Sequence, residues 1–152
     1  MLKIRGDVLA NIKQTFASSS QEQGFILGCM SCIEQLEYCI RIPAVQSGIY
    51  YYIPDTHEAD RIIKLWASQG ICFCGFIHSH VINKKQLSEN DIEFAKKLFS
   101  SYKLPVLWFG LGVFDGAQCE IFFYSVTQKN NLDIVILPVL YKGYDRMENA
   151  EK

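Results

Sequence analysis

The most informative stretch of the sequence is residues 72–91, which read CFCGFIHSHVINKKQLSEND. The apolar residues at its start predict a short buried β-strand over residues 71–80. A polar loop of seven residues, 81–87, comes next, and Ser88 is expected to begin a helix. The loop is long enough to bring the start of this helix back to the end of the strand.

This arrangement would place three metal-binding side chains together. His78 and His80 are two residues apart, so on a strand both imidazoles leave the same face. Asp91 falls in the first turn of the helix, where the positive end of the helix dipole favours an ionised carboxylate. A catalytic zinc ion typically takes three such ligands and a water molecule. The pattern predicts a zinc site formed by His78, His80 and Asp91, with Ser88 beside it.

Each of these residues also has a simpler explanation. Histidines on a strand can be ordinary core or edge residues that bind no metal. Ser88 and Asp91 form an S-x-x-D sequence, which is close to a helix capping box. His57 is interpreted as an ordinary first-turn residue of an earlier helix, without a role in the site.

The remaining elements predict one α+β domain, in the broad α/β class, over residues 1–140. Apolar residues at helical spacing indicate helices over residues 4–16 and 56–68. Strands are expected over residues 24–33, 36–44, 48–53, 105–114, 118–126 and 134–140. This order predicts helices packed around a mixed, largely antiparallel sheet. The polar tail, residues 141–152, is expected to fray.

Composition narrows the classes of function. The 152 residues are 49% hydrophobic and 20% charged, with a net charge of -1, as in an ordinary soluble domain. No basic surplus points to nucleic acid or to an anionic membrane. The longest apolar stretches, such as residues 132–140, are far shorter than the roughly 18 residues of a membrane span. The N-terminus does not read as a secretory signal, so the expected location is the cytosol.

Six cysteines agree with a reducing compartment. Most lie in apolar runs and are expected to be buried free thiols. Cys29 and Cys32 form a CxxC sequence, but the chain has no second CxxC and no distal histidine pair to complete a structural zinc site.

The joint spacing of the motif resembles a known family. The pattern H-x-H, seven residues, then S-x-x-D resembles the JAMM motif of the MPN+ metalloproteases, matched at His78, His80, Ser88 and Asp91. Residues 72–77 look like the central strand of that family, and residues 24–28 look like the G-x-x-x-G segment of its early strand. About residues 1–140 can be laid on the MPN fold.

The resemblance implies a zinc-dependent peptidase or isopeptidase. Its substrate would be the bond after the C-terminus of ubiquitin or a ubiquitin-like protein, cleaved in deconjugation or precursor processing, beside ubiquitin-like conjugation enzymes. Zinc would activate a water molecule for attack on the carbonyl. Ser88 would stabilise the developing oxyanion, and a glutamate would carry the proton to the leaving amine.

That glutamate is where the sequence departs from the family pattern, E-x-x-G. With Gly24 as the first glycine, Gln21 occupies the catalytic position and Glu22 is its neighbour. Neighbours on an extended segment point to opposite sides, so Glu22 needs a bulge or a register slip to serve. Glycine spacing favours Gln21 as the equivalent residue. The chain could then use Glu22 through a bulge, be a weak or inactive binder, or be an engineered glutamate-to-glutamine variant.

Two other functions therefore stay open. The chain could be a non-catalytic MPN module that binds a ubiquitin-like protein or scaffolds a complex. It could also be a zinc hydrolase acting on a small amide or a sulfur-carrier adduct. The four matched motif residues favour an enzyme, whereas Gln21 favours the non-catalytic module.

Overall fold

The structure is a computed structural model that describes residues 1–47, 52–80, 85–115, 118–130 and 133–145. Within these ranges the helices are α1 (Gly6–Ala17), α2 (Thr56–Ser68) and α3 (Glu89–Ser101). The strands are β1 (Leu2–Arg5), β2 (Gly24–Cys29), β3 (Gln35–Leu36), β4 (Tyr38–Ile42), β5 (Ala44–Ser47), β6 (Tyr52–Pro54), β7 (Cys72–His80), β8 (Leu107–Asp115), β9 (Gln118–Lys129), β10 (Asp133–Val139) and β11 (Tyr141–Tyr144). This content confirms the predicted α+β fold.

The main sheet is mixed and largely antiparallel, as expected. Among the described residues it has six strands in the order β10-β9-β8-β7-β2-β4. Only the β7–β8 pair is parallel; the other neighbours run antiparallel. β7 lies inside the sheet with a partner on each edge, and every residue from Phe73 to His80 is buried. Burial on both faces explains why this strand reads as a continuous apolar run.

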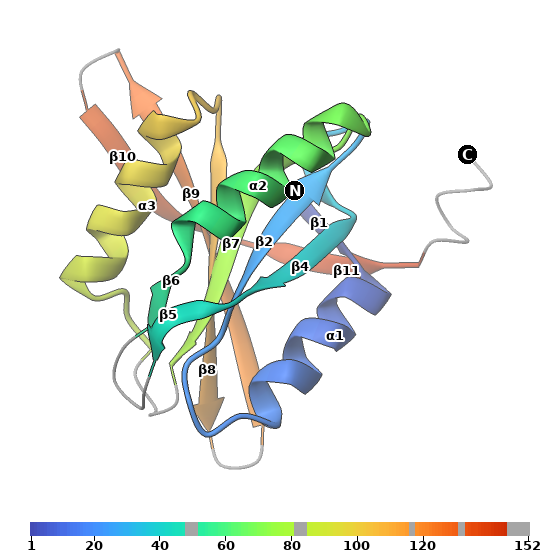
Figure 1. Cartoon of the computed structure of the whole chain (residues 1–152), viewed down its shortest axis with the longest axis vertical. Coiled ribbons are helices and arrows are strands. Elements are labelled where there is room, and N and C mark those ends of the chain that lie inside the picture. Colours follow the sequence, from blue (N-terminus) through green and yellow to red (C-terminus); the bar gives the residue numbers. More distant parts are fainter. Residues whose placement is uncertain (48–51, 81–84, 116–117, 131–132, 146–152) are drawn as a thin grey trace.

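The two faces of the sheet form two cores. One core packs under α1 and takes in Val8, Ile12 and Phe16. The other packs under α2 and α3 and takes in Trp66 and Phe99. Figure 1 shows α1 well apart from α2 and α3. The histidine face of β7 is the α2–α3 face, since Phe76, two residues before His78, belongs to that second core.

A β-bulge in β7 adjusts which side chains reach each core. Leu27 of β2 pairs with Gly75, but the next residue, Gly28, pairs with Phe73. Cys74 is therefore an extra residue on β7. Strict alternation would send Phe73 and Phe76 to opposite faces, whereas the bulge lets both pack under α2 and α3.

The two ends of the chain differ from the sequence-based expectation. The first predicted helix was expected from residue 4, but β1 precedes α1. The tail was expected to fray from residue 141, yet β11 pairs in parallel with β1, with Leu2 opposite Tyr141. The domain boundary at residue 140 is thus wrong for residues 141–144. These residues pair with β1, which is distant in sequence, so their polar local sequence gives no sign that they form a strand. Residues 146–152 lie outside the described residues.

Several smaller predictions have mixed outcomes. The helix over residues 56–68 is confirmed, and the Asp55 side chain caps it by accepting a hydrogen bond from the Glu58 N–H. Most of the strand expected over residues 48–53 lies outside the described residues. All six cysteines are free; Cys29 and Cys74 are buried as expected, whereas Cys32 and Cys72 are exposed near strand ends.

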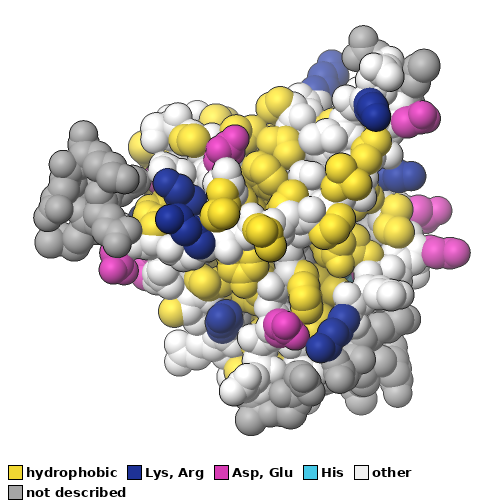
Figure 2. Space-filling model, turned by 180° about the vertical axis from the view of Figure 1, so that it is seen from behind, with side chains coloured by type: hydrophobic (Ala, Val, Ile, Leu, Met, Phe, Trp, Pro, Cys, Tyr) yellow, Lys and Arg dark blue, Asp and Glu magenta, His cyan; other side chains and the backbone are white. Residues whose placement is uncertain are grey.

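Two surface findings complete the fold. In the described part of the chain, no helix combines the length and apolar character needed to cross a membrane. Figure 2 shows the rear face, where hydrophobic side chains gather over the centre and no histidine appears among the coloured residues.

We predict that Gly75→Ala destabilises the fold by about 1–3 kcal/mol, the usual cost of overpacking. A Cβ at Gly75 would lie 2.8 Å from the backbone oxygen of Trp108, which no rotamer change can move. Gly143→Ala is the control, since its Cβ would meet nothing closer than 3.8 Å and should change stability by no more than about 0.5 kcal/mol. Urea unfolding measures both, and equal stability of the two variants would contradict the packing.

Candidate metal centre

The last residues of β7 and the first turn of α3 carry the candidate site. His78 and His80 leave the same face of β7, and their ring centroids are 5.0 Å apart with planes inclined by 79°. Asp91 sits at the third position of α3 and faces them. The structure therefore brings together the three residues that the sequence predicted as ligands.

The three ligand atoms converge on a common region. His78 Nε2 lies 2.9 Å from Asp91 Oδ1, and His80 Nε2 lies 3.2 Å from Asp91 Oδ2. One ligand atom from each of the three residues falls within 4.8 Å of the other two. This spacing allows all three residues to coordinate one ion.

Ser88 orients the carboxylate of Asp91. The Ser88 hydroxyl accepts a hydrogen bond from the Asp91 N–H at 3.1 Å, and Asp91 Oδ2 accepts one from the Ser88 N–H at 2.8 Å. This is a complete capping box. The cap and the ligand are therefore not alternative explanations of S-x-x-D, because the reciprocal hydrogen bonds that begin α3 also hold Asp91 against the histidines.

The electrostatics of the cluster suit a cation. Burial of Asp91 opposes its ionised form, but His78, His80 and the Ser88 N–H outweigh this and hold the pKa of Asp91 well below its usual range. The carboxylate is thus a permanent negative charge in a site from which water is largely excluded, since the side chains of His78 and His80 are only 5% and 7% exposed.

His78 gives the clearest test of whether a metal fits. Its ring is buried, yet within the described residues neither of its nitrogens makes a hydrogen bond. The 2.9 Å approach to Asp91 lacks hydrogen-bond geometry. A buried polar atom without a partner costs free energy, and coordination of an ion would remove that cost for the nitrogen that binds it. The cluster is able to hold a metal ion, and its two imidazoles and one carboxylate are a donor set that zinc accepts.

The structure separates Gln21 from Glu22. Gln21 is exposed, and its backbone N–H donates a hydrogen bond to the Ser19 hydroxyl. Glu22 is only 5% exposed. Glycine spacing favoured Gln21 as the residue turned toward the metal. In the structure Gln21 is exposed, and its neighbour Glu22 is the buried residue.

Strand register explains the difference. Gly24 pairs with His78, and the Ser79 N–H donates to the Gln23 carbonyl at 2.9 Å, so the antiparallel pairing continues beyond β2. If the same register continues one residue further, Glu22 comes opposite His80. Residues directly opposite in an antiparallel pair share a face, so this register would direct Glu22 to the metal-binding face. Sequence reasoning had allowed this only through a bulge or slip.

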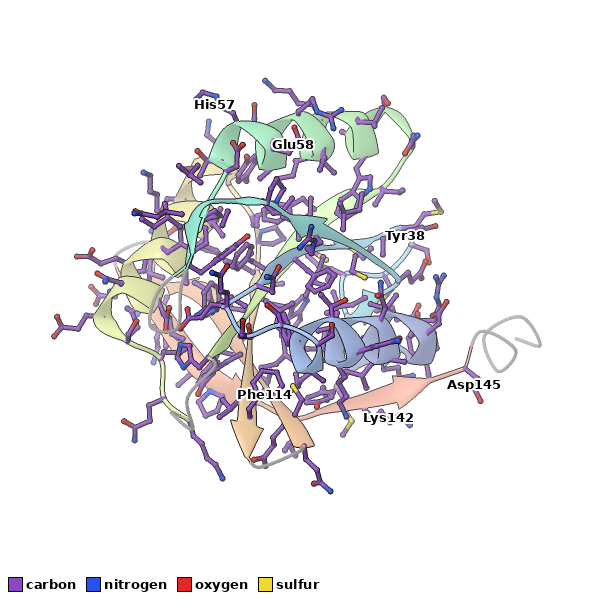
Figure 3. The ribbon with its side chains drawn as sticks, turned by 60° about the horizontal axis from the view of Figure 1, so that its bottom comes forward. Tyr38, His57, Glu58, Phe114, Lys142 and Asp145 are labelled. Atoms are coloured by element: carbon purple, nitrogen blue, oxygen red, sulfur yellow. The ribbon has the colours of Figure 1, made fainter. Side chains whose placement is uncertain are left out.

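The other residues considered from the sequence lie elsewhere. His57 is exposed in the first turn of α2, at the upper edge of the molecule in Figure 3. Among the described residues, the only group of three or more potential ligands that meets is His78, His80 and Asp91, so Cys29 and Cys32 belong to no such cluster.

A small pocket beside the cluster was not anticipated from the sequence. It has a volume of about 150 Å³ and is lined by Tyr52, Ile53, Pro54, Phe76, His78, Asn90, Asp91 and Phe94. The aromatic run at residues 50–52 was a possible signal, but nothing local shows that β6 packs beside α3.

Comparisons with known proteins support the fold alone. No family model and no curated protein matches the chain. Its fold is similar to the solution structure of protein DSY2949 from Desulfitobacterium hafniense, with a TM-score of 0.63 and 14% sequence identity over 97% of each chain. At this identity the likeness extends to the arrangement of helices and strands and carries no statement about activity.

We predict that the purified chain binds about one zinc ion and that His78→Ala abolishes this binding, since two remaining ligands are too few for a stable site. His57→Ala is the matched control, because His57 is exposed on α2. Elemental analysis after exhaustive dialysis measures the zinc content. Full zinc content in His78→Ala would contradict the assignment of the ligands.

Proposed function

We propose that this protein is a zinc-dependent peptidase or isopeptidase of the JAMM type. The observation that carries the proposal is the meeting of His78, His80 and Asp91, and the buried glutamate Glu22, two residues before β2, supports it. A metal site held by three protein ligands leaves a position for water, which is typical of catalytic rather than structural zinc. The spacing of the motif supports this family in particular.

Zinc bound to these ligands would lower the pKa of a coordinated water to about 7 and polarise the scissile carbonyl. Side chains of the protein itself would carry out proton transfer and stabilise the developing charge. Hydrolysis adds the water oxygen to the carbonyl carbon, breaks the carbon–nitrogen bond, and moves one proton from the water to the departing amine nitrogen.

We assign the proton transfer to Glu22. The register of β2 on β7 would bring Glu22 to the face of His78 and His80, and the residue is shielded from solvent. A carboxylate so placed can accept the proton of the attacking water and pass it to the leaving nitrogen. Gln21 has an amide that cannot accept this proton, and it is exposed to solvent, so we give it no part in the reaction.

We assign Ser88 to the carbonyl oxygen. Its hydroxyl oxygen already accepts the Asp91 N–H, and its own hydrogen can still be donated. A hydrogen bond from this hydroxyl would strengthen as the carbonyl oxygen gains negative charge, which is the condition for lowering the barrier. The capping box keeps Ser88 at the start of α3, beside the ligands.

The substrate class follows from the resemblance of the motif. We propose that the chain cleaves the bond after the C-terminus of ubiquitin or a ubiquitin-like protein, in the cytosol. An extended tail lying along a sheet edge would supply main-chain hydrogen bonds to the protein.

The first test concerns the proton acceptor. Glu22→Gln should lower the rate of cleavage by about 10²–10⁴-fold, the usual contribution of general acid–base catalysis, with zinc content unchanged. Gln21→Glu is the matched control and should leave the rate near that of the unmodified chain, because residue 21 faces solvent. Cleavage of ubiquitin and ubiquitin-like fusions to a reporter protein measures both rates.

The outcomes of this test separate the possible functions. A large gain in Gln21→Glu, with no loss in Glu22→Gln, would transfer the role to residue 21. A zinc-loaded chain that cleaves no fusion, with or without either change, would contradict the enzyme proposal and favour a binding module.

A second test separates the two roles of Ser88. Ser88→Ala removes an N-cap and should cost about 1 kcal/mol of stability, and it should also lower kcat by about 10²–10³-fold, as for loss of an oxyanion donor. Asp55→Ala removes the cap of α2 and should cost similar stability without affecting kcat. Equal kcat values for the two variants would show that Ser88 acts only as a cap.

A further inference from the structure

The pocket beside the metal ligands has a wall of carbon atoms. The rings of Tyr52 and Phe76 stack with centroids 6.2 Å apart, and Phe94 meets Phe76 edge-on at 5.0 Å. Ile53 and Pro54 of β6 complete the apolar side. His78 and Asp91 line the same pocket, so it opens directly onto the metal-binding cluster.

The Tyr52 ring is held in place with its polar end turned away. The hydroxyl donates a hydrogen bond to the Ile42 carbonyl at 2.7 Å. The ring also lies directly over Gly24, where a Cβ would come within 2.6 Å of a ring carbon. Burial raises the pKa of the hydroxyl, which therefore stays neutral. Tyr52 thus presents a fixed aromatic ring to the pocket, while its hydroxyl is hydrogen-bonded to β4.

Size and charge restrict what can enter. The volume of about 150 Å³ equals that of an engineered apolar cavity known to bind benzene, so a leucine or phenylalanine side chain is near the upper limit. No lysine or arginine is among the described residues that line the pocket, so an acidic side chain would lose its hydration against an apolar wall without gaining a cationic partner. The rim residue Asn90 is neutral.

We propose that this pocket is a specificity subsite that binds the apolar side chain of the residue next to the scissile bond. The inference rests on the proposed function, because the position of the scissile bond is defined by the metal ligands. Since His78 and Asp91 belong to both the pocket and the cluster, a substrate whose carbonyl reaches the metal places an adjacent side chain at the pocket. The enzyme would therefore select substrates with a medium-sized apolar residue beside the bond and reject acidic ones.

Metal-chelating hydroxamates test the subsite without any need for turnover. One series, the amino-acid hydroxamates of glycine, alanine, leucine, phenylalanine, tryptophan and aspartate, varies the acyl-side residue. A second series, malonamide hydroxamates with matching substituents on the central carbon, varies the amine-side residue. Calorimetry measures the affinity of each compound for the zinc-loaded chain.

In one of the two series the leucine-type compound should bind at least about tenfold more tightly than the glycine-type compound, since several methylene groups leave water. The tryptophan-type compound should lose that gain because it exceeds the pocket, and the aspartate-type compound should show none. The series that responds identifies the side of the bond that the pocket serves.

Two variants on the paired strands β5 and β6 test whether the preference for leucine over glycine depends on the pocket. Ile53→Ala removes part of the wall at a half-exposed residue and should reduce the leucine-over-glycine ratio by about three- to fourfold. Val45→Ala removes an apolar side chain that is 71% exposed on the neighbouring strand β5 and should leave the ratio unchanged.

Failure of the subsite and failure of the proposed function give different results. If zinc binds but both series show equal affinities, or no binding at all, the subsite is overturned while the metal centre stands. An equal loss of preference in Ile53→Ala and Val45→Ala would also overturn it. If the chain binds no zinc, the proposed function itself fails.

Discussion

The pairing of β7 on both of its edges is the constraint on which the site depends. β2 and β8 occupy the two edges, so β7 cannot slide without breaking hydrogen bonds on both sides. A slip of one residue would turn Ser79 to the metal face and both histidines away from it. Ser79 resists such a slip, because its N–H donates to the Gln23 carbonyl and its hydroxyl accepts the Gln23 N–H.

The third ligand depends on a different local device, the N-terminus of α3. The capping box of Ser88 and Asp91 satisfies backbone N–H groups at the start of the helix and aims the carboxylate at β7. Ala95 and Phe99 bury the same helix in the core beneath α2 and α3. Helix stability and metal binding therefore use the same side chain, and a loss of packing in α3 would loosen the ligand set.

Parts of the chain that are far apart in sequence meet at the end of β7. β6 brings Tyr52 and Ile53, and α3 brings Asp91. Gly24 contributes by having no side chain, which lets the Tyr52 ring lie against β2. This convergence gives a charged, metal-binding half and an apolar half within one site, which is the combination that small-molecule and peptide sites commonly show.

Much of the metal centre could be read from the sequence because its rules are local. Two residues of spacing place His78 and His80 on one face of a strand, and three residues of spacing join Ser88 to Asp91 at a helix start. The α+β class followed in the same way from periodicity, whereas the parallel pairing of β1 with β11 did not, because strand partners distant in sequence leave no local signal.

The difference in burial between Gln21 and Glu22 emerged only in the tertiary structure. In the sequence the two residues are neighbours with equal access to the site, and glycine spacing favoured Gln21. The fold buries Glu22 and leaves Gln21 exposed, and the register of β2 on β7 is what would turn Glu22 toward His80. The sequence by itself determined which side chains can bind a metal, since that depends on spacing along one strand and one helix turn. The tertiary structure decided which neighbouring residues are buried and what packs beside the ligands, since both depend on contacts between segments that the chain brings together only on folding.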